Sequence, residues 1–159
     1  MATSGKSTIG PLVSKELNMT FIDTDSIIEQ KYNKSLGQLL EDIGNEKFII
    51  EESSVISSLS CTNTCISTGG SVVYSHTAMK FLKQIAHIVF INLSYPKIEN
   101  RLASIDIKSR GIVIEKGKNL FDIYSERKPL YSIYADYTIE ADDKSIEELV
   151  AEITGIFRG

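Results

Sequence analysis

The chain has 159 residues, of which 42% are hydrophobic and 24% charged, the ordinary balance of a globular domain. Its net charge of −4 argues against a broad nucleic-acid-binding or membrane-binding surface, although a local basic pocket remains compatible with it. Since we recognise no signal peptide and no apolar run that could span a bilayer, we expect one α/β domain over residues 1–159, monomeric and cytoplasmic.

The N-terminus matches the second half of a nucleotide phosphate-binding loop. Gly5-Lys6-Ser7-Thr8 fits the end of the pattern G-x-x-x-x-G-K-[ST], whereas the first glycine and the apolar strand that feeds such a loop would stand before Met1. A chance Gly-Lys-Ser-Thr is the alternative, but this one opens an apolar-periodic helix over residues 7–17. The motif predicts that residues 4–8 bind the phosphates of ATP, and that the Ser7 hydroxyl binds Mg²⁺.

Two carboxylates follow the first predicted strand, residues 19–22, and precede a helix over residues 26–32. Asp25 could simply cap that helix, whereas Asp23 at the strand end has no such structural role. The carboxyl ends of parallel strands face the ligand crevice of α/β proteins. One of the two could therefore hold Mg²⁺ through water, and the other could accept a proton from a substrate hydroxyl.

A second loop with candidate binding residues follows the next predicted strand, residues 65–67. Ser35 and Gln38 form a capping box that opens a helix ending at Gly44, and a further helix runs over residues 45–59. After the strand come Thr68, Gly69, Gly70 and Ser71. Glycines at this place let the backbone approach a ligand, although a plain strand-to-helix turn would use them equally well.

The second half of the chain continues the alternation of strands and helices, which predicts a parallel sheet. A loop with basic residues and two glycines, about residues 104–118, is expected to act as a lid. Ser75 is expected to cap one helix, and Ser145 with Glu148 to form a capping box that opens the last one. The remaining predicted elements are a strand over 87–93, helices over 96–102, 120–127 and 129–134, and a strand over 137–139.

The remaining candidates are cysteines and arginines. Cys61 and Cys65 lack further metal ligands at suitable spacing and are interpreted as unpaired thiols of a reducing compartment. Arg101, Arg110 and Arg127 could neutralise a transferring phosphate or a substrate carboxylate. Each could also be a solvated surface charge, which is the preferred interpretation for Arg101.

Taken in order, these motifs resemble the shikimate kinase family over essentially the whole chain. The motifs are Gly5-Lys6-Ser7-Thr8, Phe21-Ile22-Asp23-Thr24-Asp25, Ile66-Ser67-Thr68-Gly69-Gly70 and Glu126-Arg127-Lys128-Pro129-Leu130-Tyr131. The resemblance implies a P-loop nucleoside-monophosphate-kinase-like three-layer α/β/α sandwich with a parallel sheet of five strands, here with the first strand missing. Loss of that central strand would leave buried backbone groups of its neighbours unpaired.

The resemblance also implies the activity and the site. It implies phosphorylation of a hydroxyl on a small polyol acid, shikimate to shikimate 3-phosphate, with ATP and Mg²⁺. Lys6 and Ser7 would serve the phosphates and the metal, with Asp23 near the metal. Asp25 would lie at the substrate hydroxyls, Gly69 and Gly70 at the substrate, Arg127 on the substrate carboxylate, and Arg110 in the lid near the phosphates.

Three positions depart from the family pattern, and all concern the acceptor or the lid. Phe48-Ile49 stands where the family has Phe-Arg, Ser71 replaces a third glycine, and the lid reads Arg110-Gly111-Ile112-Val113 instead of Arg-Pro-Leu-Leu. A kinase for a different small hydroxylated acceptor is therefore one alternative function. A non-catalytic, truncated protein is the other, and the missing strand favours it.

Overall fold

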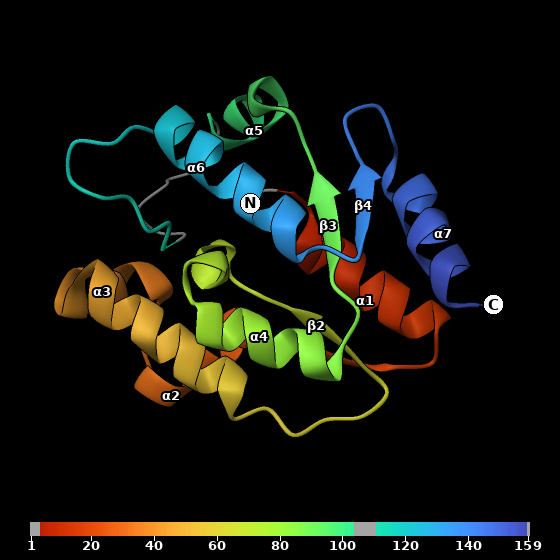
Figure 1. Ribbon diagram of the computed structural model, residues 1–159, viewed down its shortest axis with the longest axis horizontal. Helices are drawn as coiled ribbons and strands as arrows, with labels where there is room; N and C mark the ends of the chain where they lie inside the picture. Colours follow the sequence, from red (N-terminus) through yellow and green to blue (C-terminus); the bar gives the residue numbers. More distant parts are fainter. Residues whose placement is uncertain (1–3, 104–110, 159) are drawn as a thin grey trace.

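The computed structural model of the protein describes residues 4–103 and 111–158 and is shown in Figure 1. Helices and strands alternate along the chain, which confirms the predicted α/β class. The elements are α1 (Lys6–Glu16), β1 (Thr20–Asp23), α2 (Thr24–Tyr32), α3 (Leu36–Ser57), β2 (Thr64–Ser67), the 3-10 helix η1 (Gly70–Tyr74), α4 (His76–Ile85), β3 (Val89–Asn92), α5 (Tyr95–Leu102), α6 (Leu120–Tyr134), β4 (Tyr137–Glu140) and α7 (Ile146–Phe157).

The four strands form two separate parallel pairs. β1 pairs with β2 so that Asp23 lies opposite Ser67, and β3 pairs with β4 so that Asn92 lies opposite Glu140. β2 and β3 are not hydrogen-bonded to each other, and within the described residues each has only one neighbouring strand. The parallel order was predicted, and so were strands that each lack one neighbour.

A cavity of about 540 Å³ lies where the two pairs face each other. Ile66 of β2 and Ile91 of β3 line it, together with Met79 and Leu82 of α4 and Ile153 of α7. Its lining is thus mainly apolar side chains and the backbone of two strand edges. A further β-strand in this place would pair the free backbone N–H and C=O groups of the strand edges and would pack against the apolar side chains.

The buried apolar residues form three clusters that correspond to this division. One joins α1 and α7 to β3 and β4, with Ile9, Ile91, Ile139 and Ile153 among its members. The second gathers side chains of α2 and α3 around Phe48, and the third packs α3 and η1 against α4. α1 also contacts β1 and β2, so this helix bridges the two strand pairs.

Three helices, α3, α4 and α7, begin at the predicted side-chain caps. The capping boxes at Ser35 and Ser145 both form, and the Ser75 hydroxyl accepts the N–H of Ala78. Gly44 breaks the helical geometry with φ 77° and ψ 168°, so the two helices predicted around it are the two arms of a kinked α3. The two helices predicted on either side of Lys128 form the continuous α6, which contains Pro129.

None of the described helices is long and apolar enough to cross a membrane.

The gap between the strand pairs leads to a stability prediction. A variant extended at the N-terminus by an apolar strand and a loop glycine should unfold at a higher urea concentration than the 159-residue chain. Each buried backbone group that gains a partner contributes roughly 1–3 kcal/mol, so the expected gain in unfolding free energy is several kcal/mol. The control is an extension of equal length made of Gly and Ser. Equal midpoints for the two extended variants would show that the gap does not accept a strand.

Candidate active site

The loop before α1 has the geometry of a phosphate-binding helix start. Gly5 precedes the helix with a φ of 93°, a left-handed conformation that favours glycine. The N–H groups of Thr8 and Ile9 donate to the Gly5 carbonyl at 2.9 and 2.8 Å, which closes the first helical turn. The loop therefore lies at the positive end of the α1 dipole, which is where a helix binds an anion.

Lys6 extends from this loop into a region of carboxylates. Its Nζ lies 3.4 Å from the Ser4 hydroxyl oxygen, and Ser4 itself is buried. Burial lowers the pKa of the Lys6 ammonium below its usual value, while the Asp25 and Asp23 carboxylates act in the opposite direction. A partly desolvated ammonium attracts a phosphate more strongly than a fully hydrated one.

The two aspartates at the end of β1 have structural roles opposite to those considered from the sequence. Asp23, not Asp25, is the N-cap of α2, and its Oδ1 accepts the N–H of Asp25 at 3.0 Å. α2 therefore begins at Thr24, two residues earlier than predicted. The Asp25 carboxyl lies in the first turn of α2 and lines the cleft that also contains Lys6 and residues of the turn after β2. The capping interpretation was wrong because the strand continues to Asp23, which turns that residue into the helix boundary.

Asp25 is in an environment that disfavours its ionised form. Burial first, and the Asp23 carboxylate second, raise the pKa of Asp25 to about 6, although the Lys6 ammonium lowers it. Gly69 lies directly against it, because a Cβ at position 69 would stand 2.8 Å from Asp25 Oδ1. The Cβ would also stand 2.1 Å from Glu52 Oε1, so the two carboxyl groups leave no room for a side chain. This close approach requires a glycine.

Glu52 is the main residue that sequence reasoning missed. It is 1% exposed on the inner face of α3, and the Ser71 hydroxyl donates to its Oε2 at 2.7 Å. Burial raises the pKa of Glu52 to about 7, against the lowering effects of the Ser71 hydrogen bond, Arg127 and Lys6. The helical period offered a signal, since Glu52 follows Phe48 by four residues and precedes Ile56 by four, both of which are buried.

Arg127 comes into the same region from α6 and is only 2% exposed. Its Nη2 donates to the Val113 carbonyl at 2.8 Å, its Nε donates to the Tyr74 hydroxyl at 3.2 Å, and its guanidinium lies over the Tyr74 ring. The Tyr131 hydroxyl, one turn further along α6, donates to the Gly70 carbonyl at 2.6 Å. α6 thereby holds in place both the Arg127 guanidinium and, through Tyr131, the turn at Gly70.

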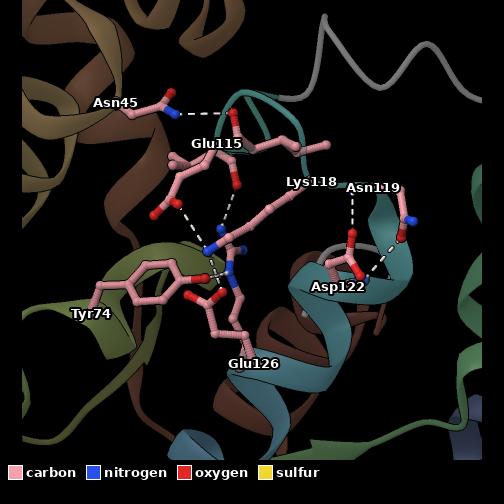
Figure 2. A network of polar contacts seen from close by, with 10 residues as sticks. Asn45, Tyr74, Glu115, Lys118, Asn119, Asp122 and Glu126 are labelled. Carbon is pink, nitrogen blue, oxygen red and sulfur yellow. Dashed lines mark hydrogen bonds and ion pairs between the residues drawn. The ribbon is translucent and has the colours of Figure 1, made fainter.

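The segment after residue 110 lies against α3 and α6 (Figure 2). Asn45 Nδ2 donates to the Ile114 carbonyl at 3.0 Å, and Val113 is 3% exposed. Lys118 reaches between Glu115 and Glu126, with Nζ–oxygen distances of 2.9 and 2.6 Å (Figure 2). Arg110 and most of the predicted lid's first half lie outside the described residues.

One cleft of about 510 Å³ brings these groups together. The predicted residues that line it are Ser4, Gly5, Lys6, Ser7, Thr8, Asp23, Asp25, Gly69, Gly70 and Arg127. Glu52, Ser71 and Arg101 line it as well, so Arg101 also faces the cleft, whereas Ile49 is not among the lining residues. Cys61 and Cys65 are free thiols that line the other cavity, and burial raises the pKa of Cys65.

The residues near the loop suit a magnesium ion that is bound mainly through nucleotide phosphates and water. Ser7 is exposed at the start of α1, and Asp23 lies at the carboxyl end of β1 in the same cleft. Mg²⁺ prefers such oxygen ligands and usually keeps several waters. Within residues 4–103 and 111–158 there is no group of three or more His, Cys, Asp or Glu side chains arranged around a metal position.

Comparisons with known proteins identify the family of the chain. The family model described as "Shikimate kinase" matches residues 2–157. A shikimate kinase of Clostridium beijerinckii is 36% identical over 96% of this chain and 88% of its own length, and one of Clostridium botulinum Alaska E43 is 34% identical over 98% and 92%. The crystal structure of shikimate kinase from Aquifex aeolicus has a TM-score of 0.80 at 30% identity and covers 100% of this chain and 92% of its own.

A solved structure with bound substrate is also similar. Shikimate kinase from Acinetobacter baumannii in complex with shikimate has a TM-score of 0.77 at 25% identity, over 97% of this chain and 87% of its own. These matches confirm the predicted P-loop kinase fold and the phosphotransferase class. With nearly its full length matched by the family model, and with the phosphate loop, the aspartates and the buried arginine in one cleft, this chain belongs to the shikimate kinase family.

Proposed function

We propose that this protein transfers the terminal phosphoryl group of ATP to a hydroxyl group of shikimate and so forms shikimate 3-phosphate. The observation that carries the proposal is the convergence of Lys6, Asp25 and Arg127 on one cleft from three different elements. Phosphoryl transfer asks a protein mainly to position its substrates and to neutralise charge. A cation for phosphate, a carboxylate for a hydroxyl and a second cation for a carboxylate meet that need.

The nucleotide side of the cleft is the start of α1. The backbone N–H groups of Gly5, Ser7 and Thr8 and the Lys6 ammonium would bind the ATP phosphates, with the buried Ser4 hydroxyl beside Lys6. The Ser7 hydroxyl and the Asp23 carboxylate would hold Mg²⁺. When bound there, the ion neutralises charge on the phosphates.

The acceptor side is formed by α2, α6 and the turn after β2. Asp25 would accept the proton of the attacking hydroxyl, since its carboxyl lines the cleft and is not the helix cap. Gly69 and Gly70 would lie against the acceptor ring, and Arg127 would bind its carboxylate by charge-assisted hydrogen bonds. Arg110 would approach the phosphates from a lid over about residues 104–118, which closes over bound substrates.

The proposed compartment, oligomeric state and partners rest on charge, cysteine chemistry and the described helices. A net charge of −4, two free thiols and the absence of a spanning helix among the described helices support a cytoplasmic monomer that acts on small molecules, without nucleic-acid or membrane partners. Two alternatives have specific observations in their favour. Ile49 and Ser71 favour a different small hydroxylated acceptor, and the gap between β2 and β3 favours a non-catalytic protein.

Lys6 provides the first functional prediction. Lys6→Ala should weaken the binding of Mg·ATP by about tenfold or more, because a hydrogen bond to a charged group contributes roughly 1.5–3 kcal/mol. Calorimetric titration of ATP into wild type and variant measures the difference. Lys15→Ala, which removes an exposed lysine from the last turn of the same helix, is the matched control. If Lys6→Ala and Lys15→Ala bind ATP equally, the loop does not bind phosphate as proposed.

Ile49 and Arg127 provide a prediction for the acceptor. Arg127→Ala should abolish shikimate binding, because it removes a buried cation of the acceptor side. Ile49→Arg should lower the KM for shikimate by about tenfold or more, since it adds a second charge-assisted hydrogen bond to the carboxylate. The measurement is steady-state kinetics on a panel of hydroxy acids and sugars that includes shikimate.

The neighbouring position supplies the control for this series. Ile50 is 65% exposed, so Ile50→Arg adds the same charge to α3 on its solvent side. An equal effect of the two arginines would indicate only a general electrostatic attraction. If Ile49→Arg leaves shikimate kinetics unchanged while wild type uses another acceptor efficiently, shikimate is the wrong acceptor and only the kinase class remains.

A further inference from the structure

Arg127 is a buried cation whose hydrogen-bond partners are neutral groups. It is 2% exposed, and within the described residues no carboxylate lies at ion-pair distance from its guanidinium. Its Nη2 donates to the Val113 carbonyl at 2.8 Å, and its Nε donates to the Tyr74 hydroxyl at 3.2 Å. A buried charge is costly unless it is paired. The charge of Arg127 is thus held in place by dipoles and is left for an anion.

Tyr74 contacts Arg127 both through its hydroxyl and through its ring. The guanidinium carbon lies 5.0 Å from the centroid of the Tyr74 ring, and a planar guanidinium is attracted to such an aromatic face. Figure 2 shows the hydroxyl end of Tyr74 directed toward Lys118 and Glu126. Burial, as the largest cause, raises the pKa of Tyr74, so its hydroxyl is uncharged at neutral pH. Tyr74 therefore orients the guanidinium without cancelling its charge.

The 3-10 helix η1 places Tyr74 against Arg127. Gly70 and Tyr74 are the first and the last residue of η1, and Arg127 and Tyr131 lie one turn apart on α6. The Tyr131 hydroxyl donates to the Gly70 carbonyl at 2.6 Å, while Arg127 donates to the Tyr74 hydroxyl. Two hydrogen bonds thus connect the two ends of η1 to successive turns of α6. The orientation of Arg127 therefore depends on η1, which begins in the glycine turn of the cleft.

The orientation of Arg127 matters because α3 supplies no guanidinium to the cleft. Ile49 stands where the family pattern has an arginine, and α3 contains no arginine at any position. An acceptor carboxylate that binds Arg127 by two parallel hydrogen bonds depends on the plane of the guanidinium. A carboxylate in place of Tyr74 would also hold Arg127, but it would compete with the acceptor for the same charge. A tyrosine meets the first need without this competition.

We propose that Tyr74 is a positioning residue for the acceptor: its ring and hydroxyl hold the Arg127 guanidinium in the plane in which it binds the acceptor carboxylate. The proposal rests on the function proposed above and adds a residue that does not itself touch the substrate, since Tyr74 is not among the residues that line the cleft. A donor that is already oriented loses less conformational freedom when its ligand binds. Loss of Tyr74 should therefore weaken the binding of the carboxylate and leave ATP binding unchanged.

The test compares shikimate with its carboxamide, which has the same ring and hydroxyl groups but no anionic group. Calorimetric titration of wild type should show a preference for shikimate of about tenfold or more. Tyr74→Leu, which removes ring and hydroxyl, should raise the Kd for shikimate about tenfold. Tyr74→Phe, which keeps the ring, should raise it about threefold. The Kd for the carboxamide and the KM for ATP should stay as in wild type.

Tyr134 provides the matched control. It is another half-buried tyrosine, its hydroxyl lies 3.1 Å from His76 Nδ1, and it is not among the residues that line the cleft. Tyr134→Phe and Tyr134→Leu should therefore retain the wild-type preference for shikimate over the carboxamide. Thermal unfolding of each variant establishes that it is folded. If Tyr74→Leu does not fold, Tyr74→Phe decides the test by the same measurements.

Two outcomes would overturn the proposal. If the folded Tyr74 variants keep the wild-type preference for shikimate over its carboxamide, Tyr74 does not orient the guanidinium for a carboxylate. If the Kd values for shikimate and for the carboxamide rise by the same factor, Tyr74 has only a structural role, because the loss does not concern the carboxylate.

The failure of the proposed function has a different signature. In that case wild type neither binds nor phosphorylates shikimate or any other acceptor of the panel, and the role proposed for Tyr74 is refuted with it. If wild type phosphorylates shikimate but the Tyr74 variants behave like the Tyr134 variants, the kinase activity stands and the positioning role is refuted alone.

Discussion

The parallel pairing of β1 with β2 is the constraint on which the candidate site depends. It places Asp23 opposite Ser67, so the turns that follow the two strands leave the same edge of the sheet side by side. A shift by one residue would turn every side chain of the shifted strand to the other face. In this register the turn after β2 comes into contact with α2 and α3, where Gly69 lies against the Asp25 and Glu52 carboxyl groups.

The charges gathered at this edge are more acidic than basic. Asp23, Asp25 and Glu52 share the cleft with Lys6 and Arg127. Burial raises the pKa of Asp25 to about 6 against the attraction of Lys6, and it raises the pKa of Glu52 to about 7 against the attraction of both cations. Anionic groups of a ligand therefore fit the two cations, whereas its hydroxyl groups fit the acids between them. A polyhydroxylated acid beside a nucleotide phosphate combines both kinds of group.

Arg127 ties this charge arrangement to the segment after residue 110. Its Nη2 donates to the Val113 carbonyl, and the same guanidinium is the proposed partner of the acceptor carboxylate. An acceptor that binds Arg127 must therefore share it with the backbone of that segment. The ion pairs of Lys118 shown in Figure 2 are solvent-accessible and contribute little by themselves. The buried Arg127–Val113 contact is the stronger connection between the acceptor side and the segment.

The sequence was sufficient for features that depend on local pattern. The capping boxes at Ser35 and Ser145, the break at Gly44 and the phosphate loop all follow from residues within a few positions of one another. What it did not reveal depends on contacts between distant segments. Glu52 acquires its role from Ser71, which is 19 residues away. The role of Asp23 as the cap could not be separated from that of Asp25 without knowing where β1 ends.

The divided sheet and the assembled site are compatible because they use different parts of the fold. Apart from the exposed Arg101 of α5 and the buried Arg127 of α6, the candidate residues that the structure describes come from β1, β2 and the helices and turns that adjoin them, whereas the described strands β3 and β4 contribute none. α1 is where the two parts meet. It carries Lys6 at its start, it contacts β1 and β2, and its Ile9 and Val13 belong to the core around β3, β4 and α7. Ile9 and Val13 also line the cavity between the strand pairs, so a strand that filled this cavity would contact α1. The nucleotide side is thus connected to the gap through α1, while the acceptor side combines the β1–β2 pair with Arg127 of α6.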